Sequence, residues 1–180
     1  MAFSNKLYGK VTTEEGRQGY AAFAAALAAH YKGQDVLFEI WNEPNVRTFW
    51  GAQSPARHNS KEFAEGYVAL VQATVPAMKK ADPDCFVMAG SVSGLWSASC
   101  QWQEDCFQKG ILKTGIDAWS VHPYSTKCPE DVVEGYQKVR DLMAASGAPR
   151  DFIILNSERG YPVGKAEGFA GGDAARSKEY

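Results

Sequence analysis

Apolar residues recur at helical spacing along three long segments of the chain. In the first, residues 20–31 place them on one face of a 3.6-residue period, and Thr12 followed by Glu15 is a capping-box pattern that would begin the helix. Ser60 is placed to cap the second segment, and Pro129 would start the third. We therefore expect full helices over residues 12–32, from residue 60 to the turn at 82–84 and from residue 129 to 147, with a short helix near 107–112.

Short apolar runs bounded by turn residues lie between the helical segments, which is the pattern of buried strands. They cover residues 36–41, 85–89, 118–121 and 152–157. Strands that alternate with helices are typical of parallel βα units. A complete (β/α)8 barrel needs roughly 250 residues and at least about 200, whereas this chain has 180. The sequence therefore predicts one α/β domain over residues 1–180, a partial (half) TIM barrel of about four parallel β-strands with flanking helices.

Two of the predicted strands end in an acid. Glu43 follows the first strand in the segment FEIWNEPN (38–45), and Glu158 closes the fourth in FIILNSE (152–158). Parallel α/β folds place their active sites at the carboxyl ends of strands, so we expect the two carboxylates to converge. Glycoside hydrolysis is the reaction class that such a pair serves best.

Composition and charge narrow the range of partners. The formal net charge is -2, and Lys and Arg are scattered along the chain, which argues against nucleic acid. No apolar stretch is long enough for a membrane span. The apolar residues 21–29 follow Glu14 and Glu15 rather than a basic segment, so they indicate a helix and not a signal peptide. We expect a soluble chain, cytosolic or derived from a secreted parent that has lost its export signal.

Three segments together resemble clan A of the glycoside hydrolases, and most closely its family 39 of β-glycosidases. They are WNEP (41–44), SVHPY (120–124) and NSERGYP (156–162), and each lies at a predicted strand end in the matching order. The resemblance implies a retaining glycoside hydrolase, a β-glycosidase or β-glycanase, that acts on plant-type or microbial oligosaccharide or polysaccharide without a cofactor.

The same resemblance implies roles for five residues. Glu43 would be the general acid/base and Glu158 the nucleophile. Asn42 would bind the sugar 2-hydroxyl, a contact that strengthens in the transition state. His122 and Tyr124 would line the sugar site and orient the nucleophile.

Three tryptophans are candidates for binding sugar. Trp50, Trp96 and Trp102 lie in segments expected to be loops after the first two strands, on the presumed active face. Such rings can stack on a pyranose, and the alternative is ordinary packing inside the loops.

The match to the clan begins at its fourth strand, so strands one to three and strand eight have no counterpart among residues 1–180. A non-enzymatic alternative is therefore a half-barrel that binds carbohydrate or is purely structural, and another is a truncated piece that is inactive until complemented. A half-barrel also leaves edge strands and an apolar face open, which predicts a homodimer that completes the barrel.

Strand alternation places Glu39 on the inner face with Trp41 and Glu43, and we expect Glu39 to be hydrated there.

The four cysteines raise two further alternatives. Cys100 and Cys106 are close enough in one expected loop to form a disulfide, whereas Cys85 should be buried and inert. Cys100, Cys106, Cys128 and His122 could hold zinc, but their spacing matches no recognised pattern, so no metal is expected.

Overall fold

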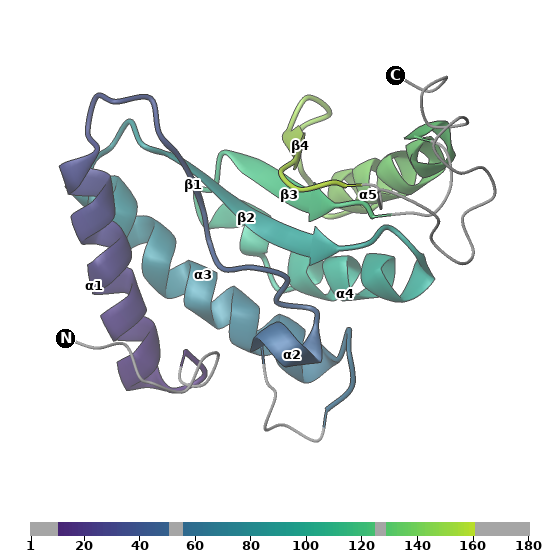
Figure 1. Ribbon diagram of the computed structural model, residues 1–180, viewed down its shortest axis with the longest axis horizontal. Coiled ribbons are helices and arrows are strands. Elements are labelled where there is room, and N and C mark those ends of the chain that lie inside the picture. Colours follow the sequence, from purple (N-terminus) through teal and green to yellow (C-terminus); the bar gives the residue numbers. More distant parts are fainter. Residues whose placement is uncertain (1–10, 51–55, 125–128, 161–180) are drawn as a thin grey trace.

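A computed structural model of the chain describes residues 11–50, 56–124 and 129–160, which form a parallel sheet covered by helices (Figure 1). The sheet has four strands in the order β1-β2-β3-β4, and every neighbouring pair is parallel. The strands are β1 (Leu37–Glu39), β2 (Phe86–Ser93), β3 (Ala118–His122) and β4 (Ile153–Asn156). The predicted α/β fold with four parallel strands is confirmed.

One helix precedes β1, and the others lie between successive strands. The helices are α1 (Glu14–His30), α2 (Arg47–Trp50), α3 (Lys61–Ala81), α4 (Ser97–Gln108) and α5 (Val133–Ala145), with short 3-10 turns at Ile111–Lys113 and Pro129–Val132. Helix α1 packs along α3, and Figure 1 shows α3 and α4 on the same side of the sheet. Within the described ranges, no helix combines the length and apolar character that a bilayer crossing requires.

Capping side chains set two helix starts. The Ser60 hydroxyl accepts a hydrogen bond from the backbone N–H of Phe63 at 3.3 Å, as expected for the start of α3. For α1 the cap is Thr13, whose hydroxyl accepts from Gly16 N–H at 3.1 Å. The predicted start at Thr12 is therefore wrong by one residue.

Helix α4 occupies a segment that we expected to be a loop with a short helix near 107–112. Its regular turns bury Trp102, Cys106 and Phe107 against the rest of the core. The start of the segment is rich in serine, which on its own favours turns over helix, and this led us to expect a loop. Tertiary packing outweighs that preference here.

The two faces of the sheet differ in chemistry. Val87 and Ala89 of β2 and Trp119 and Val121 of β3 are fully buried in the hydrophobic core on the helix-covered face. The opposite, inner face carries polar side chains toward the carboxyl ends of the strands, described below. Toward the amino ends it is apolar and open, with Leu37 56% and Ile153 44% exposed. The homodimer that would cover this surface stays a prediction.

A β-bulge shapes the end of β2. The register with β3 shifts between Ala89 and Val92, where Gly90 has φ +121° and Ser91 has φ +48°. Tyr67 of α3 stabilises the bulge, because its hydroxyl accepts from Gly90 N–H at 2.8 Å and donates to the Ile40 carbonyl at 2.9 Å. We expected this strand to end at Ala89, since Gly-Ser resembles a turn. Instead the bulge carries the strand onward to Ser93.

Candidate active site

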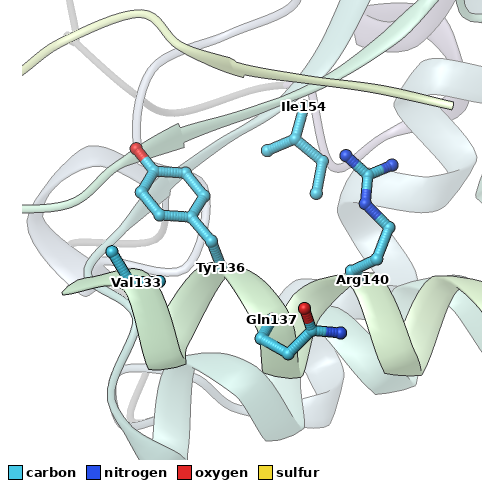
Figure 2. Close-up of a pocket in the computed structure, with 5 residues that line it drawn as sticks. All are labelled: Val133, Tyr136, Gln137, Arg140 and Ile154. Carbon is cyan, nitrogen blue, oxygen red and sulfur yellow. The ribbon is translucent and has the colours of Figure 1, made fainter. Parts of the chain in front are cut away.

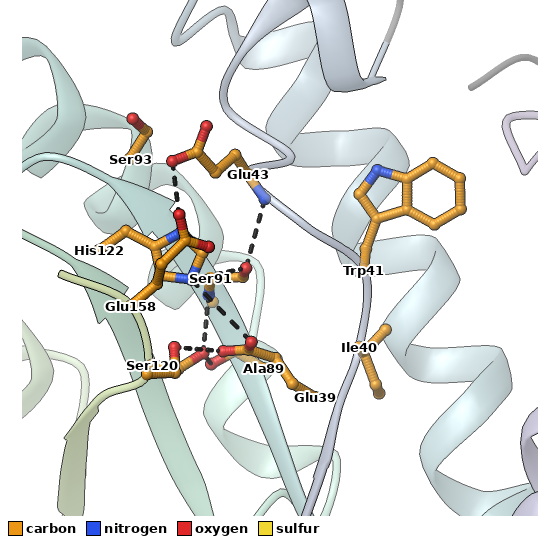
Figure 3. A network of polar contacts seen from close by, with 12 residues as sticks. Glu39, Ile40, Trp41, Glu43, Ala89, Ser91, Ser93, Ser120, His122 and Glu158 are labelled. Atoms are coloured by element: carbon orange, nitrogen blue, oxygen red, sulfur yellow. Dashed lines mark hydrogen bonds and ion pairs between the residues drawn. The ribbon is translucent and has the colours of Figure 1, made fainter. Parts of the chain in front are cut away.

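Glu43, His122 and Glu158 converge at the carboxyl ends of the strands (Figure 3). One side-chain N or O atom from each lies within 4.8 Å of the other two. The His122 Nδ1 atom is 3.2 Å from Glu43 Oε1 and 3.6 Å from Glu158 Oε2. The fold thus brings the two strand-end acids to one imidazole, as parallel strands allow.

Glu43 lies in a turn that follows β1 at once. Its φ is +43°, its backbone N–H donates to Ser91 Oγ at 3.3 Å, and its side chain is 12% exposed. Asn45 is buried just beyond, and its side-chain amide both donates to the Ser93 carbonyl and accepts from Ser93 N–H, each at 3.0 Å. These bonds hold the turn that carries Glu43 against the end of β2. Asn42 lies in the same turn with an exposed side chain.

Trp41 does not share the inner face with Glu39 and Glu43, so the expected alternation is wrong there. Strand β1 ends at Glu39, and Trp41 has φ +68°, which turns its side chain to the other side (Figure 3). Its indole N–H donates to the Phe49 carbonyl at 3.1 Å, and its ring meets Trp50 edge-on. Alternation holds only while the backbone stays extended.

Glu158 follows β4 and is the most accessible of the converging acids, with its side chain 49% exposed. The Tyr124 hydroxyl donates to Glu158 Oε1 at 2.7 Å. This hydrogen bond raises the pKa of Tyr124, so the phenol keeps its proton and serves as a donor. One oxygen of Glu158 is thereby fixed, and its side chain remains open to a ligand.

His122 is the buried centre of the cluster, with its side chain 1% exposed. Burial acts to lower its pKa, but the carboxylates of Glu39, Glu43 and Glu158 outweigh burial and raise the pKa to about 9. The imidazole is therefore a cation at neutral pH. Because folding raises this pKa, protonation stabilises the fold fully below pH 6.5, and the stabilisation is lost as the pH rises through about 9.

Glu39 is paired rather than hydrated, contrary to our expectation. Its Oε1 atom accepts from Ser157 Oγ at 2.7 Å, its Oε2 atom lies 3.9 Å from His122 Nε2, and the side chain is 22% exposed. Burial acts to raise the pKa of Glu39, but the interactions with His122, Ser120 and Ser157 prevail and lower it. Because the sheet is curved, Ser157 after β4 reaches Glu39 of β1, which a flat open sheet would not allow.

Two of the three candidate tryptophans are core residues. Trp50 is 2% and Trp102 0% exposed, and both pack against the ring of Tyr67 at centroid distances of 5.9 and 5.7 Å. Neither ring offers a face to a sugar, so this part of the prediction is wrong. Trp96 is 51% exposed at the start of α4 and retains an accessible ring.

The cysteines form no disulfide in the described part of the chain. Cys85, Cys100 and Cys106 are free, buried thiols. Cys100 and Cys106 lie six residues apart on α4, about 9 Å along its axis, which is too far for a disulfide. Cys128 lies outside the described residues. Cys100 and Cys106 do not lie with His122 in any cluster of metal-ligating side chains among the described residues.

A separate pocket lies away from the carboxylates, between α5 and β4 (Figure 2). It has a volume of about 240 Å³. Its lining consists of Val133, Tyr136, Gln137, Arg140 and Ile154. The Arg140 guanidinium already donates to the Phe152 carbonyl, so it supports the edge strand β4.

Sequence reasoning missed the serines that support the cluster. Ser91 Oγ lies 3.2 Å from His122 Nε2, and Ser120 Oγ accepts from Ser91 N–H at 2.7 Å. Ser157 bonds Glu39 as described. A Gly-Ser pair inside an apolar run is a signal for a bulge, and it could have placed Ser91 at the site.

Comparison with known proteins finds relatives among the β-xylosidases. No family model matches the chain. A β-xylosidase of Geobacillus stearothermophilus is 27% identical over 169 residues, which covers 78% of this chain and 31% of that protein. The solved GH39 β-xylosidase of Caulobacter crescentus aligns with a TM-score of 0.57 at 25% identity, over 88% of this chain and 32% of that one.

A second solved structure, the GH39 enzyme of Xanthomonas axonopodis pv. citri, gives a TM-score of 0.56 at 22% identity, over 82% of this chain and 31% of that one. The resemblance to family 39 is thereby confirmed. The chain spans about a third of the length of these relatives, which corresponds to part of their barrel.

Proposed function

We propose that this partial family 39 glycoside hydrolase domain carries the catalytic carboxylates of a retaining β-glycosidase, with β-xylosides as the first substrates to test. The observation that carries the proposal is the bridging of Glu43 and Glu158 by His122, with their interacting atoms within 4.8 Å. Retaining enzymes hold their two carboxyl groups about 5 to 5.5 Å apart, so that one can attack while the other donates a proton.

The cluster supports a division of labour between the two acids. Glu158 is open to solvent and fixed by Tyr124, which suits attack on the anomeric carbon. Glu43 would give its proton to the departing oxygen as that bond breaks. In the second step Glu43 would take a proton from water, whose oxygen displaces Glu158 from the sugar. Asn42, beside Glu43, is proposed to bind the sugar 2-hydroxyl, and the chemistry calls for no cofactor.

The first experiment is release of nitrophenol from aryl β-xyloside, β-glucoside, β-galactoside and β-cellobioside. We expect the wild-type chain to hydrolyse at least one of these glycosides. Glu43→Gln should lower the rate of hydrolysis by a factor that depends on the leaving group. An acid matters most for a poor leaving group, so the loss should be about 10²-fold or more for a phenyl or alkyl glycoside and smaller for dinitrophenyl. Absence of turnover from the folded wild-type chain would refute the proposal.

Trp96 is proposed as a sugar platform beside the carboxylates. Its ring lies so close over Gly94 that a Cβ on that glycine would fall 1.6 Å from the indole. Gly94 N–H in turn donates to the His122 carbonyl at 2.9 Å. One ring face is thus supported by backbone next to the site, and the side chain remains half exposed.

Trp96→Ala should raise KM about 3- to 10-fold with little change in kcat, because stacking contributes about 0.5 to 1.5 kcal/mol to sugar binding. Steady-state kinetics on the best aryl glycoside would measure this. Phe23→Ala, which removes a similarly exposed ring from α1, is the control and should leave KM unchanged. A change in kcat alone would contradict a platform role.

The alternative is a half-barrel that binds oligosaccharide without turnover. It is favoured by the coverage of only about a third of the relatives' length. In that case titration with xylo-oligosaccharides should show binding that Trp96→Ala weakens, while no aryl glycoside is hydrolysed.

A further inference from the structure

The cluster contains one carboxylate that the proposed mechanism does not use. Glu39 ends β1 on the inner face of the sheet, behind His122 as seen from Glu43 and Glu158. Its two oxygens have different neighbours, since Oε1 accepts from Ser157 Oγ at 2.7 Å and Oε2 faces His122 Nε2 at 3.9 Å. The residue therefore contacts both the imidazole and the residue that precedes Glu158.

We propose that Glu39 is a positioning residue, which acts as the constant counter-ion of His122 and anchors Glu158 through Ser157. The inference rests on the proposed function, since it assigns Glu39 a part in the same reaction. Glu39 itself would touch neither the sugar nor the reacting atoms.

The anchor follows from the sheet geometry. Strands β1 and β4 are separated by β2 and β3, which on a flat sheet would place them about 14 Å apart. A direct hydrogen bond between Glu39 and Ser157 closes that distance across the concave inner face. Ser157 is bonded on its backbone as well, because its N–H donates to the Val121 carbonyl at 3.3 Å. With both contacts in place, the backbone at Glu158 has little freedom to move away from His122.

The counter-ion role follows from the charges around the imidazole. Among the described residues three carboxylates face His122: Glu39 from β1, Glu43 from the turn after it and Glu158 from the end of β4, while Ser91 of β2 is its neutral neighbour. In a retaining cycle Glu43 gives up and regains a proton, and Glu158 loses its charge when it bonds to the sugar. Glu39 takes part in neither step. It can keep His122 protonated while the other two charges change.

The test is the titration of His122 in the Glu39→Gln variant, which removes the charge but keeps the shape and a hydrogen bond acceptor for Ser157. Imidazole signals of His30, His58 and His122 can be followed by NMR and assigned with His122→Asn. We expect the His122 midpoint to fall by about one pH unit or more, and the pH profile of kcat/KM to change with it. Glu65→Gln, which breaks an exposed pair with Lys109, is the matched control and should shift neither. An unchanged His122 midpoint in Glu39→Gln would overturn the counter-ion role.

Two further variants separate charge from anchorage. Glu39→Asp keeps the charge on a shorter side chain, so its His122 midpoint should lie between those of the wild type and Glu39→Gln. If Glu39→Gln does not fold, a midpoint of Glu39→Asp below the wild-type value is the expected result, and an unchanged one would overturn the counter-ion role. Ser157→Ala keeps the charge and removes the anchor, so kcat should fall roughly 10-fold or more with the His122 midpoint unchanged. An unaltered kcat in Ser157→Ala would refute the anchor.

The outcomes are distinguishable from failure of the proposed function. If the wild-type chain hydrolyses no glycoside, the proposed function fails, and the NMR titration still decides whether Glu39 sets the charge of His122. If the wild-type chain is active and Glu39→Gln moves neither the midpoint nor the pH profile, the proposed function stands and the role of Glu39 is wrong.

Discussion

Replacing Glu158 by Gln should leave a folded chain whose turnover of aryl β-glycosides is lost by a factor of about 10⁴ or more, as expected when a nucleophile is removed. A neutral amide cannot attack the anomeric carbon, even though it can still accept the hydrogen bond from Tyr124. The side chain is half exposed and buries little apolar surface, so losing its ion pair with His122 should lower the free energy of unfolding by no more than about 1 kcal/mol. Initial rates with nitrophenyl and dinitrophenyl glycosides, together with a urea melt, would measure both effects.

Small anions make this test specific for the nucleophile. Azide can occupy the space left by Glu158→Ala and attack the same face of the sugar, which should give a glycosyl azide of inverted configuration. With Glu43→Ala, azide would instead react with the glycosyl-enzyme and give the retained configuration. Glu104→Gln on α4, which removes an acid whose hydrogen bonds within the described residues are to Gln101 and Gln108, controls for loss of charge. Near-normal activity in Glu158→Gln would contradict the assigned role.

Gly90→Ala should cost about 2 to 6 kcal/mol of unfolding free energy, the sum of backbone strain of about 1 to 3 and overpacking of about 1 to 3 kcal/mol. At φ +121° an added Cβ would lie 2.4 Å from the Ser120 carbonyl oxygen and 3.0 Å from the Trp119 ring. The backbone of β2 would have to move away from β3, and Ser91 would move with it. Urea unfolding followed by tryptophan fluorescence would measure the loss of stability.

Gly147→Ala is the matched control for this prediction. Gly147 also has positive φ, +85°, but a Cβ there would meet nothing within 4 Å. It should lose only about 1 to 2 kcal/mol, the cost of the left-handed conformation for a residue with a side chain. Equal losses in the two variants would mean that the sheet relaxes around Gly90 without cost.

Much of the fold could be predicted because it depends on local pattern. The cap at Ser60 and the four apolar runs lie where the sequence places them, since capping and periodicity depend on neighbouring residues. Helix α4 could not be predicted in the same way, because its apolar face forms only when Trp102 and Phe107 reach the core. The bulge at Gly90 could not be predicted for a similar reason, because it depends on a hydrogen bond to Tyr67 of α3.

The candidate site likewise has features that local sequence predicts and features that depend on tertiary packing. The sequence by itself determined that Glu43 and Glu158 follow parallel strands, and so lie at one edge of the sheet, because strand direction fixes which ends meet. Only the tertiary structure decided which groups surround them. The backbone leaves the extended conformation at Trp41, so that ring turns away, and the curvature of the sheet brings Ser157 to Glu39. The contact between Glu39 and Ser157 joins residues 118 positions apart, and its geometry depends on the packing of the whole sheet rather than on any local run of sequence.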